Sequence, residues 1–304
     1  MEKETKGEEF SRRSFLKTLG GGAIGTVVLA GAAMPERNYI GANTSWVDVG
    51  EGTRAFLTAP QQGKAPFRAV ILGHERYGLV QHTLDLAAKF AAYGYICVAP
   101  DMASHWKGDK VALNRGDARL TLTPDQIKYY MGKGLDYLLT QPQVDKTRVA
   151  AMGVCQSGDY PLLLNSVRKE VAANLIFYGG VNIGEDVIAT VTAPILGVFG
   201  EADHVISLDA VHKFRGNLER HRKSYEFKVF AEMPHGWLND TMPGRYRQAQ
   251  SEAAWAMMID FLNRVYAGAY HLAECARASI RTSMWITTSR RTFGSNDPKR
   301  WRSR

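Results

Sequence analysis

The feature that most constrains the fold is the stretch 149–161, which reads VAAMGVCQSGDYP. Its apolar half, residues 149–154, predicts a buried strand, and a helix-like run follows. Small residues, Gly153 and Ser157, stand two positions before and two positions after Cys155. This spacing is typical of a nucleophile elbow, a tight strand-to-helix turn that exposes its central side chain. We therefore expect Cys155 at a helix N-terminus, where the helix dipole favours a thiolate. A buried cysteine at an ordinary strand end is the alternative.

Strand-like and helix-like runs alternate along the rest of the chain. Two short runs joined by Gly50-Glu51-Gly52 predict an N-terminal hairpin, with strands at 44–49 and 53–58. Further strands are expected at 68–72, 95–100, 172–178, 195–199 and 225–230, and helices at 81–93, 123–140, 158–169, 207–220 and 245–266. Segment 101–123 is expected to be irregular, and segment 179–193 is expected to form a loop or a small excursion. The alternation predicts an α/β fold: a mostly parallel sheet with helices on both faces and an N-terminal antiparallel hairpin.

The charge distribution argues against a nucleic-acid function. The 304-residue chain has a formal net charge of +8, but residues 267–304 carry +6 of it and residues 41–266 only +1. A basic tail is not a basic binding face, so we expect no nucleic-acid partner. The three cysteines form no C-x-x-C pair and have no metal-ligand spacing with histidine, so we expect no disulfide scaffold, no metal and no cofactor.

The N-terminus has the features of an export signal. Residues 11–17, SRRSFLK, are typical of a twin-arginine signal, and a Gly/Ala-rich apolar region with an A-x-A-like site at 30–32 follows. We therefore expect a signal peptide at 1–33, one α/β domain at 34–266 and a basic, disordered tail at 267–304. The twin-arginine translocation machinery would be a partner during export to the periplasm or beyond, and the mature protein would be a monomer. An uncleaved anchor is the alternative.

Three loops that follow predicted strands carry Cys155, Asp203 and His235. The carboxyl ends of parallel strands meet at one edge of a sheet, where ligands bind. Nucleophile, acid and histidine in this chain order match the triads of α/β-hydrolases. Cys155 would be the nucleophile, His235 would take and return its proton, and Asp203 would orient the imidazole. Taken singly, Asp203 could instead cap the helix near Ser207, and His235 could be a surface turn residue.

Two backbone amides should receive the oxyanion that forms during acyl transfer. One is the amide of Gln156, directly after the nucleophile, and the other is expected from Arg76 in the loop after the strand 68–72. Three aromatic side chains could line an apolar pocket at the same edge or could simply be packed: Tyr77, Trp106 and Trp237.

These motifs together resemble the dienelactone hydrolase family of α/β-hydrolases, over residues 45–266. The resemblance is carried by GHERYG at 73–78, APD at 99–101, GVCQSG at 153–158, FGEAD at 199–203 and PHGW at 234–237. It implies Cys155, Asp203 and His235 as the triad, and a contact of Glu75 with the resting thiol. A carboxylate beside a thiol keeps it neutral, and substrate binding would redirect Glu75. An ion pair of Glu75 with Arg76 or another nearby base is the alternative.

The sequence departs from that family at two points. Ser157 stands where the family has glycine, and serine is small enough for the turn to survive. Dienelactone-processing members hold the substrate carboxylate with arginines, and here loop position alone suggests candidates: Arg76, Arg115, Arg119, Arg245 and Arg247.

The sequence therefore predicts an exported hydrolase of ester or lactone bonds that acts through a thioester on Cys155. The alternatives are a general carboxylesterase or thioesterase with the same triad, and a non-catalytic binding protein of the same fold. A thiol redox protein would need a disulfide between Cys97 and Cys155.

Overall fold

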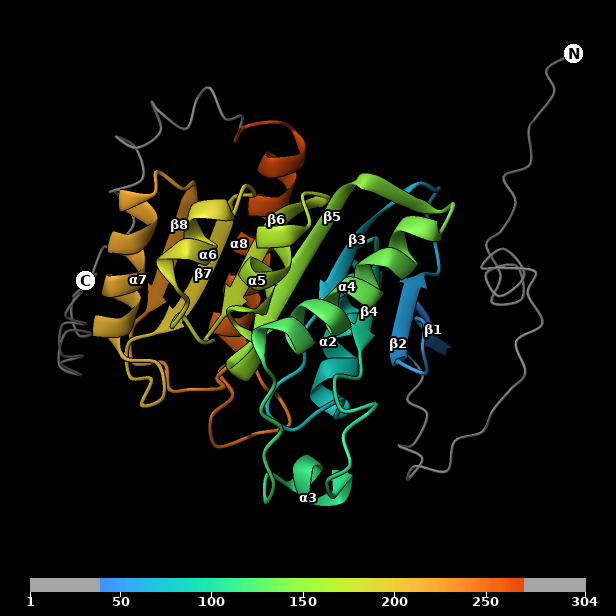
Figure 1. Ribbon diagram of the computed structural model, residues 1–304, viewed down its shortest axis with the longest axis horizontal. Coiled ribbons are helices and arrows are strands. Elements are labelled where there is room, and N and C mark those ends of the chain that lie inside the picture. Colours follow the sequence, from blue (N-terminus) through green and yellow to red (C-terminus); the bar gives the residue numbers. More distant parts are fainter. Residues whose placement is uncertain (1–38, 271–304) are drawn as a thin grey trace, which may run out of the picture.

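The computed structural model describes residues 39–270, which fold around a central eight-stranded sheet (Figure 1). The order is β1-β2-β4-β3-β5-β6-β7-β8. β1 pairs antiparallel with β2, and β2 with β4, whereas all other neighbours are parallel. The strands are β1 Ala42–Asp48, β2 Arg54–Pro60, β3 Phe67–Leu72, β4 Tyr95–Pro100, β5 Val144–Val154, β6 Val171–Phe177, β7 Ile195–Gly200 and β8 Tyr225–Phe230. The predicted fold class is confirmed, whereas the predicted signal peptide and residues 271–304 of the predicted tail lie outside the described residues.

Helices cover both faces of this sheet (Figure 1). They are α2 Gln81–Ala92, α3 Lys110–Arg115, α4 Pro124–Thr140, α5 Tyr160–Val167, α6 Glu185–Thr190, α7 Leu208–Arg220 and α8 Gln248–Tyr266. α2 and α8 share one face, where the rings of Phe90 and Trp255 pack with centroids 4.8 Å apart. α4, α5, α6 and α7 cover the other. Among the described residues, no helix combines the length and apolarity that a membrane crossing requires.

Helix starts follow the signals in the sequence. The Thr123 side chain accepts a hydrogen bond from the amide of Gln126, and the Gln126 side chain accepts one from the amide of Thr123. Pro124 occupies the first turn of α4, where it has no amide hydrogen to leave unpaired. The Ser207 side chain caps α7 by accepting a hydrogen bond from the amide of Ala210, so Asp203 is not the cap of this helix.

The structure corrects several element boundaries. Segment 101–123 is not wholly irregular, because it contains the short helix α3, and the excursion expected at 179–193 contains the short helix α6. α3 has only six residues, and Asp109 begins it by accepting hydrogen bonds from the amides of Val111 and Ala112. α8 begins at Gln248 rather than at Arg245, because the amide of Arg245 donates to the carbonyl of Met242 in a preceding turn. α5 ends at Val167, two residues before the predicted end.

Candidate active site

The elbow at the end of β5 has the strained geometry that its sequence predicts. Cys155 has a φ angle of 55°, in the left-handed region that non-glycine residues seldom adopt. The turn is tight, because a Cβ atom on Gly153 would lie 1.9 Å from the carbonyl oxygen of Ser157. The residues directly after β5 form a 3-10 turn, Cys155–Ser157, and α5 begins only at Tyr160. Cys155 thus opens a 3-10 turn rather than the first turn of an α-helix.

Ser157, the departure from the family pattern, fits because another glycine faces it. Its side chain is buried, and its hydroxyl lies 3.0 Å from both the amide nitrogen and the carbonyl oxygen of Val154. A Cβ atom on Gly73, at the end of β3, would lie only 2.9 Å from the Ser157 hydroxyl oxygen. The missing side chain at Gly73 therefore makes room for the serine, which closes the elbow with hydrogen bonds that glycine could not make.

Cys155, His235 and Asp203 are brought together at the carboxyl edge of the sheet, from the loops after β5, β8 and β7. The His235 Nε2 atom lies 3.1 Å from the Cys155 sulfur, and His235 Nδ1 lies 2.9 Å from Asp203 Oδ2. Asp203 Oδ1 also accepts hydrogen bonds from the amides of Val205 and Ile206, at 2.7 and 2.9 Å. The carboxylate is thereby held in the orientation that the imidazole needs.

The pKa shifts of His235 and Asp203 favour a charged pair between these two side chains. Burial alone would lower the pKa of His235, but hydrogen bonds to Asp203 and to the Cys155 sulfur raise this pKa to about 9. Burial would raise the pKa of Asp203, yet the hydrogen bonds from His235 and from the loop amides lower it on balance. A protonated imidazole donates from both nitrogens, and the two contacts of His235 accommodate this form.

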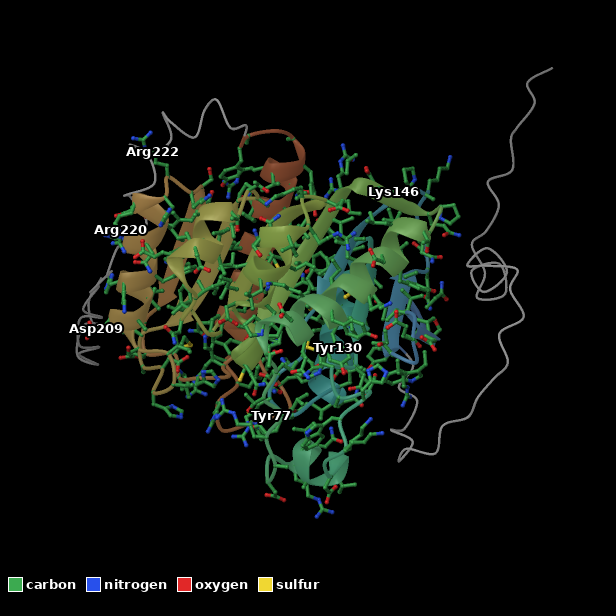
Figure 2. The ribbon with its side chains drawn as sticks, viewed as in Figure 1. Tyr77, Tyr130, Lys146, Asp209, Arg220 and Arg222 are labelled. Carbon is green, nitrogen blue, oxygen red and sulfur yellow. The ribbon has the colours of Figure 1, made fainter. Side chains whose placement is uncertain are left out.

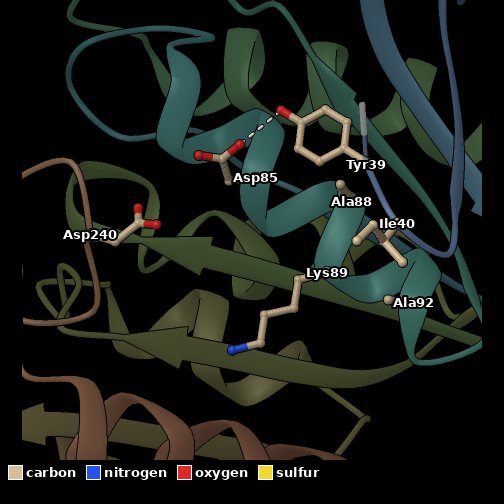
Figure 3. Close-up of a pocket in the computed structure, with 7 residues that line it drawn as sticks. All are labelled: Tyr39, Ile40, Asp85, Ala88, Lys89, Ala92 and Asp240. Carbon is tan, nitrogen blue, oxygen red and sulfur yellow. Dashed lines mark hydrogen bonds between the residues drawn. The ribbon is translucent and has the colours of Figure 1, made fainter. Parts of the chain in front are cut away.

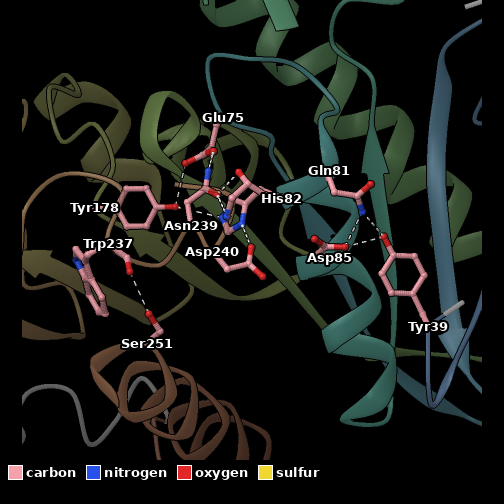
Figure 4. A network of polar contacts seen from close by, with 11 residues as sticks. Tyr39, Glu75, Gln81, His82, Asp85, Tyr178, Trp237, Asn239, Asp240 and Ser251 are labelled. Atoms are coloured by element: carbon pink, nitrogen blue, oxygen red, sulfur yellow. Dashed lines mark hydrogen bonds and ion pairs between the residues drawn. The ribbon is translucent and has the colours of Figure 1, made fainter. Parts of the chain in front are cut away.

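Glu75 does not make the contact that the family resemblance implies. Its side chain is buried, Oε1 accepts a hydrogen bond of 3.0 Å from the Tyr178 hydroxyl, and Oε2 accepts one of 2.8 Å from the Asn239 amide (Figure 4). Within residues 39–270 we find no hydrogen bond between Glu75 and Cys155 and no ion pair of Glu75 with Arg76. A hydroxyl and an amide are stronger hydrogen-bond donors than a thiol, so the Glu75 carboxylate accepts from Tyr178 and Asn239 rather than from Cys155.

Tyr178 and Asn239 are site residues that the sequence analysis missed. Tyr178 directly follows β6 at the same sheet edge, has a φ of 37° and is fully buried. Its ring stands edge-on to that of His235, with centroids 5.4 Å apart. Asn239 lies four residues after His235 in the same loop. The position of Tyr178 directly after a parallel strand was the available signal, since such positions meet at the ligand-binding edge.

The predicted oxyanion donors occupy loops at this edge. Arg76 lies in the loop after β3, and Gln156 directly follows the nucleophile. Within residues 39–270, neither backbone amide donates a hydrogen bond to a main-chain carbonyl of a loop or turn, or to a side chain. Both positions are therefore compatible with donation to a substrate oxygen.

The three predicted pocket residues differ in their surroundings. Trp237 is 0% exposed and packs against Phe230 with ring centroids 5.0 Å apart, so it belongs to the core and lines no open pocket. Trp106 is half-buried against the α4 side of the core. Tyr77, labelled in Figure 2, is half-buried, and the Arg76 guanidinium lies 5.1 Å from the centre of its ring.

A shallow cavity of about 320 Å³ lies elsewhere, against α2 (Figure 3). Its lining includes none of the predicted site residues; it is formed by Tyr39, Ile40, Asp85, Ala88, Lys89, Ala92 and Asp240.

The two cysteines in the described residues are both free thiols. Cys97 is fully buried in β4, and burial raises its pKa far above the ordinary range. β4 is separated from β5 by β3, so Cys97 does not neighbour the elbow strand. The disulfide that a redox function would need is absent from this part of the chain.

Asp159, four residues after the nucleophile, is expected to destabilise the protein at alkaline pH. Burial raises the pKa of its carboxyl to about 6, whereas the carboxyl of the unfolded chain ionises at its ordinary, lower pKa. The folded state therefore binds more protons between the two values, and stability falls as the pH rises through about 6. Asp159→Asn should raise the free energy of unfolding at pH 8 by about 1–3 kcal/mol.

Urea denaturation at pH 8 and at pH 4 measures this effect. The gain should vanish at pH 4, because the carboxyl is then neutral in the folded protein. Asp117→Asn, at an exposed position, serves as the matched control and should leave stability unchanged at both pH values. An Asp159→Asn variant no more stable than the parent at pH 8 would contradict the prediction.

Comparison with known proteins relates this chain to one family. The model of the dienelactone hydrolase family matches residues 53–266. The carboxymethylenebutenolidase homolog of Xenopus tropicalis is 27% identical over 194 residues, which cover 62% of this chain and 77% of that protein.

Solved structures share the fold at lower identity. A dienelactone hydrolase-like promiscuous phosphotriesterase, P91, from metagenomic libraries aligns with a TM-score of 0.63 at 19% identity, over 74% of this chain and 98% of that one. Est1E from Butyrivibrio proteoclasticus aligns with a TM-score of 0.53 at 15% identity, over 71% and 98% of the two chains. The family match spans more than two thirds of the chain, including the loops that carry Arg76 and Gln156, so the chain belongs to the dienelactone hydrolase family and is a hydrolase of ester or lactone bonds.

Proposed function

We propose that this protein hydrolyses esters or lactones with a Cys155–His235–Asp203 triad through a thioester intermediate. The observation that carries the proposal is the continuous line of contacts from the Cys155 sulfur through both nitrogens of His235 to Asp203. The strained elbow, which presents the thiol at the sheet edge, supports the same assignment.

The chemistry follows from these positions. The Cys155 thiolate attacks the substrate carbonyl carbon, and the amides of Arg76 and Gln156 bind the oxyanion. Collapse of this intermediate forms the thioester and expels the alkoxide, which takes a proton from His235. Water then loses a proton to His235 and attacks the thioester carbon. The carboxylic acid leaves, and the thiolate and the imidazolium are restored.

The substrate is proposed as a small ester or lactone. The printed name of the Xenopus relative, a carboxymethylenebutenolidase homolog, supports a lactone. Two of the five candidate arginines are already engaged with main-chain carbonyls, Arg76 with that of Gly116 and Arg247 with those of Gly244 and Tyr246. Their engagement favours, as a second candidate, a general carboxylesterase that acts on neutral esters.

Hydrolysis of a small substrate panel tests the proposal. The panel holds an activated acetate ester, a long-chain ester, a simple lactone and a dienelactone, each assayed with the purified protein and with Cys155→Ala. Turnover that depends on Cys155 is expected, and preference for the dienelactone over neutral esters would decide between the two candidates. A folded protein that turns over none of the four would favour the non-catalytic binding protein.

The position of Glu75 should keep the thiol reactive before substrate binds. In Tyr178→Phe, Glu75 loses one of its two donors and becomes free to turn toward the sulfur, where its charge would disfavour the thiolate. Alkylation of Cys155 by iodoacetamide at pH 7 should then slow by about three- to tenfold. Mass spectrometry of the Cys155 peptide measures the rate.

The matched control is Tyr225→Phe, which removes a similar hydrogen bond to Glu219 far from the site. It should alkylate at the parental rate. A Tyr178→Phe variant that alkylates as fast as this control would show that Glu75 does not depend on Tyr178 for its position.

We also propose export through the twin-arginine pathway, on the basis of residues 11–17. Fractionation of cells that express the full chain should find the protein in the periplasm or the medium. The double variant Arg12→Lys, Arg13→Lys should remain in the cytoplasm. Equal distribution of both forms would exclude the pathway.

A further inference from the structure

Residues 102–120, hereafter the strap, leave the end of β4, form α3 and return toward α4. Figure 1 shows α3 standing beyond the carboxyl edge of the sheet, away from both helical layers. The strap is anchored in the core by buried side chains that include those of Met102, Leu113 and Leu120. Its residues Ser104 and His105 also hydrogen-bond to the hairpin and to α4, at Arg54, Glu51 and Tyr130. A further set of contacts joins the strap to the two segments that carry the proposed oxyanion amides.

One end of α3 is fixed to the loop after β3. The Arg76 guanidinium donates a hydrogen bond of 2.6 Å to the carbonyl of Gly116, and the Asn114 side chain donates one of 2.8 Å to the carbonyl of Tyr77. Gly116 ends α3 with a φ of 88°, and a Cβ atom there would lie 2.8 Å from the Tyr77 ring. The strap and the Arg76 loop are thus in close contact.

The return of the strap is fixed to the elbow. The Gln156 side chain donates a hydrogen bond of 2.7 Å from Nε2 to the carbonyl of Leu120. The residue directly after the nucleophile therefore holds the strap with its side chain, while its backbone amide remains available to substrate.

A buried histidine fixes the start of the strap. The amide of Met102 donates to His74 Nε2 at 3.2 Å, so the ring proton resides on Nδ1, which donates to the carbonyl of Glu75 at 2.8 Å. Burial lowers the pKa of His74, which keeps the ring neutral and this pair of contacts intact. These three attachments thus join the strap to the residues that carry or flank the two amides.

We propose that the strap sets the spacing of the oxyanion hole, and that the side chains of Arg76 and Gln156 are positioning residues for their own backbone amides. The proposal rests on the proposed function. Each residue that offers an amide to the oxyanion also binds a strap carbonyl, so the strap couples two loops from different strands. Oxyanion donors act only at about 2.7–3.1 Å from the developing charge, so a loop that shifts by a fraction of an ångström loses stabilisation.

The test removes each side-chain contact and keeps each backbone amide. Arg76→Met and Gln156→Met should each lower kcat for a neutral activated acetate ester by about tenfold, and the double variant by about 100-fold, with KM unchanged within about twofold. Alkylation of Cys155 by iodoacetamide should stay within about twofold of the parent, because it forms no oxyanion. Arg76→Lys, which retains a donor, should recover part of the loss. The exposed strap residue Lys107, changed to Met, is the matched control and should behave as the parent.

Amide hydrogen exchange of residues 110–120 provides a readout that needs no activity. Exchange should accelerate in Arg76→Met and Gln156→Met and remain parental in Lys107→Met. Unchanged exchange, unchanged kcat, or an equal loss of alkylation and hydrolysis would each overturn the proposal. A parent protein without esterase activity would refute the proposed function and, with it, the oxyanion role of the strap. The exchange data would still show separately whether the two side chains hold the strap.

Discussion

Replacing Cys155 with alanine is expected to lower kcat by about 10⁵-fold, to the residual rate that substrate binding and the oxyanion donors supply. The sulfur lies 3.1 Å from His235 Nε2, and no other thiol in residues 39–270 is accessible, because Cys97 is fully buried. Without the sulfur, no thioester can form, and the remaining groups can only polarise the substrate. The measurement is the rate of ester hydrolysis, together with mass spectrometry of the acylated protein under rapid quench.

Cys97→Ala provides the matched control, since it removes the other described thiol and leaves the elbow untouched. It should retain parental kcat and should still trap an acyl group on Cys155. If Cys155→Ala kept even a tenth of the parental rate, nucleophilic catalysis by this residue would be excluded.

Asp203→Asn is expected to lower kcat by about 10³–10⁴-fold without unfolding the protein. The carboxylate accepts the hydrogen bond from His235 Nδ1, which keeps the Nε2 atom directed at the sulfur. The Asp203 carboxylate also raises the pKa of His235. An uncharged side chain at this position would lower that pKa, so less imidazolium would stand beside the Cys155 sulfur near neutral pH. An asparagine oxygen could still accept from the amides of Val205 and Ile206, and the loop should therefore keep its shape.

The pH dependence of Cys155 alkylation separates this effect from a structural one. In the parent the imidazolium persists until the pH rises through about 9, whereas in Asp203→Asn it should lose its proton at a lower pH. Alkylation near neutral pH should then be slower than in the parent, while circular dichroism and the unfolding midpoint stay close to parental. Asp117→Asn, at an exposed position, is the control. A loss of less than tenfold in kcat would show that Asp203 does not orient the histidine.

Local patterns in the sequence were enough to predict the α/β sheet, the elbow turn and the meeting of Cys155, Asp203 and His235. Apolar runs of four to eight residues, capping residues such as Thr123 and Ser207, and the small residues around Cys155 each act over a few positions, so their consequences can be predicted without the rest of the chain. Cys155, Asp203 and His235 each follow a parallel strand, and parallel strands bring the following loops to one edge of the sheet.

Only the tertiary structure decided which groups the site residues contact. Glu75 is bound by Tyr178 and Asn239, which lie 103 and 164 residues away in sequence. Trp237 turned out to be a core residue. Likewise, the contacts of Arg76 and Gln156 with the strap depend on how a segment without clear periodicity crosses the sheet edge. Packing of the whole domain and competition among hydrogen-bond donors decide which side chains meet over such separations. A local sequence pattern therefore cannot predict these partners.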